Sequence, residues 1–226
     1  FPLIPTIPRT GNYSCKSGEL KKALNSVVFA VSSSENRVEL TGVLLSFNKN
    51  KLSVASTDSY RLAERELDVK VNDLEGEQKI IVPAKTVQEL LRVLSNLEGT
   101  ELGEEQEVKF YLAENQILFT VDSVELISRL INGHYPDYKQ IIPAKSQTDV
   151  LVERTELIRA VKAAALFSKT GINDITLLFF KEKIVVSAFS GTSGESQIEL
   201  EADVKGGDNE VTINYRYLLD GLNNIE

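Results

Sequence analysis

The sequence contains no methionine and no tryptophan, and it has a single cysteine, Cys15, and a single histidine, His134. One cysteine excludes a disulfide within the chain and is typical of a reducing compartment, so we expect a cytoplasmic protein. One thiol and one imidazole are also too few for a zinc site built from cysteine and histidine. Runs of about 18 apolar residues are absent. Residues 1–5 lack the basic and apolar regions of a signal peptide, so we predict neither a membrane span nor export.

Patterns that would indicate catalysis are missing as well. The chain has no glycine-rich phosphate loop and no short motif that pairs two carboxylates. His134 lies between Gly133 and Tyr135 in a predicted turn, where a hydrogen-bonded structural histidine is the simpler interpretation. Cys15 lies near the start of the fold and is more readily explained as a small apolar side chain than as a nucleophile. We predict no catalytic residue, no metal site and no cofactor.

The chain is acidic, with 33 aspartate and glutamate residues against 25 lysine and arginine residues and a formal net charge of −8. This balance disfavours nucleic-acid binding, because phosphate contacts require lysine and arginine. The acids, however, concentrate in predicted loops and edges at 64–77 and 98–107, whereas many basic residues fall on predicted helices. An acidic chain can therefore still present one basic face.

A strand, a polar turn and a second strand are predicted around residues 57–59. Leu52 and Val54 alternate with small polar residues before the turn, and the polar side chains of the turn can bind their own backbone. Arg61 and Leu62 then lie at the start of the second strand. Such a turn is more often a solvated hairpin than a site, so its meaning depends on the rest of the chain.

Helices and short strands alternate along the chain in a repeating order. Apolar spacing predicts helices at 17–31, 86–94, 155–167 and 217–225, the first with Ser17 as its cap. Strands are predicted at 38–47, 52–55, 61–69, 79–82, 108–112, 116–121 and 124–131. The helix at 155–167 repeats the pattern of the helix at 17–31, and 177–186 repeats 45–54. One helix followed by a small antiparallel sheet thus occurs three times, with a fourth copy beginning near the C-terminus.

The ends of the chain and its middle suggest the domain organisation. Residues 1–12 contain three prolines and are predicted to be an extended lead-in. The polar run 146–148 predicts a boundary between domains at 1–147 and 148–226. The chain starts without methionine and ends inside an apparently helical run, so we expect a fragment of a longer protein.

Basic side chains recur on the predicted helices. Arg159 and Lys162 fall opposite the apolar stripe of the helix at 155–167. A charged surface helix is common, but if four such helices line one surface they would bind a nucleic-acid backbone without reading its sequence. Phe29 falls on the polar side of the first helix, which indicates either a frayed last turn or contact with another domain.

Several segments together resemble the family of the bacterial replication sliding clamp, the beta subunit of DNA polymerase III. Each segment alone is weak evidence, but their order and spacing are highly specific and cover essentially the whole chain. The segments are Phe29-Ala30-Val31-Ser32, Leu40-Thr41-Gly42-Val43-Leu44, Ala55-Ser56-Thr57-Asp58-Ser59-Tyr60-Arg61-Leu62-Ala63, Ile81-Val82-Pro83, Tyr135-Pro136-Asp137-Tyr138 and Asn214-Tyr215-Arg216-Tyr217-Leu218-Leu219-Asp220.

The resemblance implies an α+β fold of DNA-clamp domains, each built from two repeats of a helix plus a small antiparallel sheet. Residues 1–147 would be the middle domain of a three-domain clamp, and residues 148–226 the N-terminal part of its third domain. Family members are head-to-tail homodimers that close into a ring. The implied function is a non-enzymatic processivity factor that encircles double-stranded DNA and tethers the polymerase catalytic subunit, the clamp loader and other proteins.

The resemblance also implies a pocket, between the middle and third domains, for short partner peptides rich in glutamine, leucine and phenylalanine. Carried over residue by residue, its members are Leu40, Thr57, Ser59, Tyr60, Arg61, Leu62, Pro136 and Ile141. The apolar members can form a depression, and Arg61 with the polar turn can orient the amides of a peptide. The chain departs from the family in Tyr60, where histidine is common, and in Gln140, where a basic residue is common. The C-terminal strand that completes the pocket lies beyond Glu226, so we expect a half-built pocket.

Two further surfaces follow from the resemblance. The residues expected to face DNA are Lys22, Arg37, Lys85, Arg92, Arg159 and Lys162. Leu166 and Phe167 fall where the third domain meets the first domain of the partner, and Phe29 occupies the equivalent repeat position. We expect both Phe29 and Leu166 to be substantially exposed.

Two other classes of protein compete with this interpretation. A β-rich protein-interaction module that does not act on DNA is distinguished by whether the helices gather on one concave basic surface. An enzyme would instead have a closed cleft with converging acids.

Overall fold

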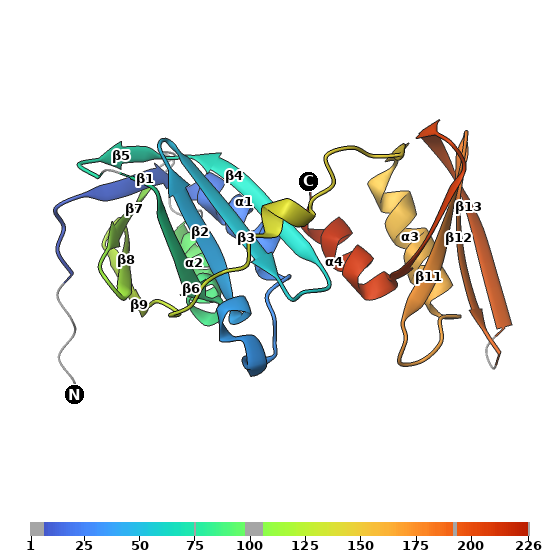
Figure 1. The fold of residues 1–226 in the computed structure, drawn as a ribbon, viewed down its shortest axis with the longest axis horizontal. Coiled ribbons are helices and arrows are strands. Elements are labelled where there is room, and N and C mark those ends of the chain that lie inside the picture. The colour runs from blue at the N-terminus through green and yellow to red at the C-terminus, as the bar shows by residue number, and fades with distance from the viewer. Residues whose placement is uncertain (1–6, 75, 98–105, 192–193, 226) are drawn as a thin grey trace. The chain divides into compact units, whose positions relative to one another are not determined.

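The computed structural model describes residues 7–74, 76–97, 106–191 and 194–225. The chain forms two compact units, Phe1–Pro136 and Asp137–Glu226, and each combines helices with antiparallel strands (Figure 1). This is the predicted α+β class. The two units divide between Pro136 and Asp137, which is earlier in the chain than the boundary expected after residue 147. The second unit therefore also includes the short 3-10 helix η2 (Tyr138–Ile141). Among the described helices, none combines the length and apolar character needed to cross a membrane.

The described residues of the first unit contain the α-helices α1 (Ser17–Val28) and α2 (Ala84–Leu97), which pack against each other. Its two antiparallel sheets have the orders β4-β3-β2-β6 and β5-β1-β7-β8-β9. The strands are β1 (Asn12–Lys16), β2 (Gly42–Asn48), β3 (Lys51–Thr57), β4 (Leu62–Asp68), β5 (Lys70–Asn72), β6 (Gln78–Pro83), β7 (Glu107–Leu112), β8 (Gln116–Val121) and β9 (Val124–Arg129). Helix α1 packs on β3 and β4, and α2 packs on β2 and β6.

The core of the first unit follows from the apolar spacing of its elements. Leu20, Leu24 and Val27 lie on one face of α1 and are fully buried. Tyr13 of β1 stacks on Phe47 of β2, with 4.1 Å between ring centroids. One core therefore joins the two sheets and fixes the strands that carry the turn between β3 and β4.

The described part of the second unit contains α3 (Arg154–Ala165), α4 (Tyr215–Asn224) and a sheet in the order β10-β13-β12-β11-β14. Its strands are β10 (Thr148–Val152), β11 (Asp174–Phe180), β12 (Lys183–Ser190), β13 (Gly194–Gly206) and β14 (Asn209–Asn214). The predicted apolar stripe of α3, formed by Leu157, Val161 and Ala164, is buried against the sheet. Helix α4 has no fully buried residue.

Two local predictions were wrong. The strand predicted at 38–47 begins only at Gly42, and residues 38–41 belong to the 3-10 helix η1 (Glu35–Thr41), because local side-chain bonds compete with strand pairing. The hydroxyl of Ser34 accepts from the N–H of Asn36, and that of Thr41 donates to the carbonyl of Val38. Ser17 does not cap α1: the cap position is Lys16, and no side-chain hydrogen bond caps the helix there. Strand β1 immediately precedes it and was not predicted.

Candidate functional site

The turn that joins β3 to β4 is held by its own side chains. The Asp58 carboxylate accepts hydrogen bonds from the N–H groups of Tyr60 and Arg61, at 2.9 and 3.1 Å. The Thr57 hydroxyl donates to the carbonyl oxygen of Arg61 at 2.6 Å and accepts from the N–H of Ser59 at 3.1 Å. Ser59 has a φ of 79°, a conformation that these bonds stabilise. The predicted polar turn therefore has one defined backbone conformation.

The Arg61 side chain folds back onto the first unit and is only 19% exposed. Its Nε lies 3.0 Å from Oδ2 of Asp58, and its Nη2 donates to the carbonyl oxygen of Phe29 at 2.9 Å. The guanidinium carbon lies 5.5 Å from the centroid of the Phe29 ring, at cation–π distance. The guanidinium thus stabilises the conformation of the turn, whereas from the sequence it was expected to orient the amides of a bound peptide.

Two other side chains project at the surface of the turn. Tyr60 is 82% exposed. Arg37, on η1, donates from Nη1 to the hydroxyl of Ser59 at 3.2 Å and from Nε to Glu39 at 3.0 Å. The pKa of Glu39 is lowered by a hydrogen bond from its own backbone and then by Arg37. Arg37, which was expected among the DNA-facing residues, lies beside the turn and is ion-paired with Glu39 there.

The apolar residues predicted for the pocket differ in burial. Leu40 is 1% exposed and belongs to the core, whereas Leu62 and Pro136 are half-buried. The hydroxyl of Tyr135 accepts a hydrogen bond from the N–H of Thr57 at 2.9 Å, which ties the segment before Pro136 to β3. Burial raises the pKa of Tyr135 to about 12. Tyr135 was missed from the sequence; the available signal was an aromatic residue directly before a turn proline.

The remaining predicted contact residues vary in exposure. Leu166 is 77% exposed, as expected. Phe29 was also expected to be substantially exposed, but it is partly buried, because Arg61 lies over its ring. Phe167 is also partly buried and packs against the core under α3. Ile141 is 72% exposed and belongs to the second unit.

The predicted basic residues of the helices are all exposed. They are Lys22 on α1, Lys85 and Arg92 on α2, and Arg159 and Lys162 on α3. Helices α1 and α2 each carry two basic residues and one acidic residue, and α3 carries three and one, in a chain that is acidic overall. Three of the cations pair with a carboxylate three residues earlier: Lys22 with Glu19, Arg92 with Glu89, and Arg159 with Glu156. Exposed pairs of this kind contribute little stability, so these cations remain available to an anionic ligand.

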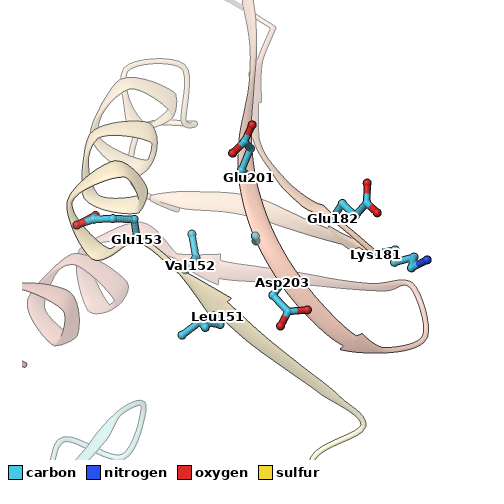
Figure 2. A pocket seen from close by; sticks show the side chains of 8 residues that line it. Leu151, Val152, Glu153, Lys181, Glu182, Glu201 and Asp203 are labelled. Carbon is cyan, nitrogen blue, oxygen red and sulfur yellow. The ribbon is translucent and has the colours of Figure 1, made fainter.

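A hollow of about 600 Å³ in the second unit lies between β10, β13 and the β11–β12 turn. Its lining includes Glu153, Glu182, Glu201 and Asp203, none of which was predicted as a site residue. The side chains of Glu153, Glu182 and Glu201 point in different directions (Figure 2). Within the described ranges, no group of three potential metal ligands comes together. This hollow therefore lacks the converging acids of a hydrolytic or metal site.

The two residues that could have indicated reactivity lie outside any such cluster. Burial, with smaller effects of Glu107 and Glu19, raises the pKa of the Cys15 thiol to about 12. Cys15 is therefore an unreactive core residue at neutral pH. His134 is exposed and has no hydrogen-bond partner in the part of the chain that the structure describes, contrary to the expected hydrogen-bonded role.

Comparison with known proteins assigns each part of the chain to one family. Residues 14–137 match the model of the DNA polymerase III beta subunit, central domain, and residues 139–226 match that of its C-terminal domain. Among curated proteins, a beta sliding clamp of Staphylococcus aureus is 32% identical over 228 residues, and one of Staphylococcus epidermidis is 31% identical. Both alignments cover 100% of this chain and 58% of the relative.

Solved structures give the same result. The DNA polymerase III subunit beta from Pseudomonas aeruginosa is 28% identical with a TM-score of 0.90, and the match covers 100% of this chain and 60% of that one. The DNA polymerase sliding clamp from Bacillus subtilis is 29% identical with a TM-score of 0.89, over 100% and 58% of the two chains. The chain thus spans less than two thirds of the length of these relatives.

Proposed function

The chain belongs to the family of the DNA polymerase III beta subunit, and we propose that it forms part of a sliding clamp that encircles double-stranded DNA. One observation carries this proposal: residues 14–137 match the central domain of the family, and residues 139–226, which follow almost directly, match its C-terminal domain. The clamp would be a non-catalytic, cytoplasmic accessory subunit that keeps a replicative polymerase on its template. A homodimeric ring would be formed by the whole protein.

We assign DNA contact to the exposed cations of the helices. Lys22 of α1, Lys85 and Arg92 of α2, and Arg159 and Lys162 of α3 give the helices a positive balance that the rest of the chain lacks. Contacts from such side chains to phosphates position a duplex without reading its bases. Sequence-independent binding is what a protein that moves along DNA requires.

We assign partner docking to the turn between β3 and β4. Half-buried Leu62 and Pro136 provide apolar contact, and exposed Tyr60 provides an aromatic surface beside them. The Arg37 guanidinium adds a donor at the same turn. These groups suit a short peptide that carries leucine, phenylalanine and an amide or carboxylate side chain. The polymerase catalytic subunit and the clamp loader are the partners that we propose for this surface.

The encircling function is tested by the topology of the DNA. A protein of the relatives' length that contains this sequence is to be loaded by its clamp loader on closed circular duplex and separated by gel filtration. We expect it to remain on the circle and to be released when a restriction enzyme cuts the DNA once. Equal retention on circular and linear DNA would show simple electrostatic binding and would contradict an encircling ring.

A further inference from the structure

The C-terminal end of α1 obtains hydrogen-bond donors from the strands of the neighbouring hairpin. The helix has no basic residue in its last turn, and Phe29 directly follows its last residue. Carbonyl groups at this end of a helix lack intrahelical donors and favour a nearby cation. The carbonyl oxygen of Val27 accepts from the N–H of Ala30 at 2.9 Å. Two side chains also donate at this end of the helix: the hydroxyl of Ser56 to the carbonyl oxygen of Val27, and the guanidinium of Arg61 to that of Phe29. These two donors lie on either side of the turn between β3 and β4.

The same guanidinium also holds the backbone of the turn. Arg61 contacts one oxygen of the Asp58 carboxylate at 3.0 Å, and the other oxygen accepts from the N–H groups of Tyr60 and Arg61. The side chains of Arg61 and Asp58 are 19% and 15% exposed, so water competes only weakly with these bonds. A continuous series of contacts therefore runs from Phe29 through Arg61 and Asp58 to the backbone of Tyr60.

We propose that Arg61 is a positioning residue that couples the end of α1 to the conformation of the docking turn. A contact that displaces Phe29 removes the ring and the carbonyl oxygen that orient the guanidinium. Arg61 then no longer fixes Asp58, and the N–H groups of Tyr60 and Arg61 lose their acceptor. Because coupling is reciprocal, a peptide bound at the turn stabilises the end of α1 in return. The inference rests on the proposed function only in assigning the peptide to this turn.

Two variants of the 226-residue chain separate coupling from direct contact. Arg61→Lys keeps the charge but cannot donate in a fork to two acceptors, and Phe29→Ala removes the ring that lies under the guanidinium. Arg129→Lys, an exposed arginine on β9, is the matched control. Circular dichroism confirms that each variant is folded. Amide hydrogen exchange of Tyr60 and Arg61, followed by NMR, reports the state of the turn, and anisotropy of a labelled Gln-Leu-Phe-type peptide reports binding.

We expect Arg61→Lys to accelerate exchange of both amides and to weaken peptide binding about tenfold, the usual effect of losing a charged hydrogen bond. Phe29→Ala keeps the carbonyl acceptor and removes only the cation–π contact of the ring, so we expect it to change both measurements in the same direction by a smaller factor. Because both substitutions break the same series of contacts, the double variant should be little worse than Arg61→Lys alone. Arg129→Lys should change neither measurement.

Unchanged exchange at Tyr60 and Arg61 in Phe29→Ala would overturn the coupling, whatever the peptide does. Weaker binding in Arg61→Lys without faster exchange would also overturn it, because Arg61 would then contact the peptide directly. If the parent chain does not bind the peptide, the docking function assigned to the turn fails. The exchange rates then decide the coupling alone, and acceleration in both variants still supports it.

Discussion

Ser56 is fully buried, and its hydroxyl donates to the carbonyl oxygen of Val27 at the end of α1. Ser56→Ala removes the side-chain donor, while the N–H of Ala30 still donates to this carbonyl at 2.9 Å, so we expect the free energy of unfolding to fall by about 0.5–1.5 kcal/mol. Urea denaturation followed by circular dichroism measures the change. Ser53→Ala on the same strand is the control, because the hydroxyl of Ser53 has no hydrogen-bond partner among the described residues. Equal stability of the two variants would contradict the role given to Ser56.

Burial raises the pKa of the Cys15 thiol from its usual 9.0 to about 12. We therefore expect alkylation of the native chain by iodoacetamide near pH 8 to be at least about a hundredfold slower than alkylation of the urea-unfolded chain, because the thiolate is the nucleophile. The raised pKa contributes stability that is complete below about pH 9 and is lost as the pH rises toward 12. Rapid native alkylation, measured by mass spectrometry, would contradict this burial.

At the scale of single elements, Glu153 caps α3. Its carboxylate accepts hydrogen bonds from the N–H groups of Thr155 and Glu156, and the bond from Glu156 is the largest cause of its lowered pKa. The stabilisation is present above the usual value of 4.5 and is lost as the pH falls through the lowered one. We expect Glu153→Ala to lower the melting temperature at neutral pH, and this deficit to shrink near pH 3. Glu182→Ala, an exposed glutamate in the β11–β12 turn, is the control. A deficit independent of pH would contradict capping by the carboxylate.

Regular elements with long apolar patterns could be predicted from the sequence. The helices at 84–97 and 154–165 and the strand at 116–121 follow from spacing that places one apolar face in the core. Strand β1 escaped prediction because its five residues follow a proline-rich segment and most of them are buried, which gives no alternation of period two. Element η1 escaped because its local capping bonds outweigh the strand propensity of its residues.

The candidate site could be located from the sequence, but the roles of its arginines could not. The polar turn predicts its own backbone bonds through Thr57 and Asp58. Whether Arg61 or Arg37 faces outward depends on the carbonyl of Phe29 and the hydroxyl of Ser59, which lie far from them along the chain. Side-chain direction of this kind is set by tertiary contacts, and spacing alone carries no information about it.

At the scale of the whole molecule, the cations on the helices determine how DNA binding depends on salt. Lys85 and Lys162 are exposed and have no ion-pair partner within the described ranges. We expect each lysine-to-alanine change to reduce the slope of log affinity against log salt by about one, because one counterion fewer is released. Titration of a labelled duplex at several salt concentrations measures the slope. Lys70→Ala is the control and should leave the slope unchanged, because this exposed lysine lies on strand β5 and not on a helix. Unchanged slopes in both test variants would remove these helices from the DNA-binding surface.

Docking of partner peptides at the turn between β3 and β4 is the central claim for this chain, and one titration tests it most directly. Fluorescence anisotropy of a labelled Gln-Leu-Phe-type peptide is to be measured with the parent chain and with the double variant Arg61→Ala, Leu62→Ala. We predict saturable binding to the parent and none to the double variant, because the variant loses the fixed turn and an apolar contact together. Binding that survives in the double variant, or no saturable binding to the parent at high micromolar concentration, would contradict the account.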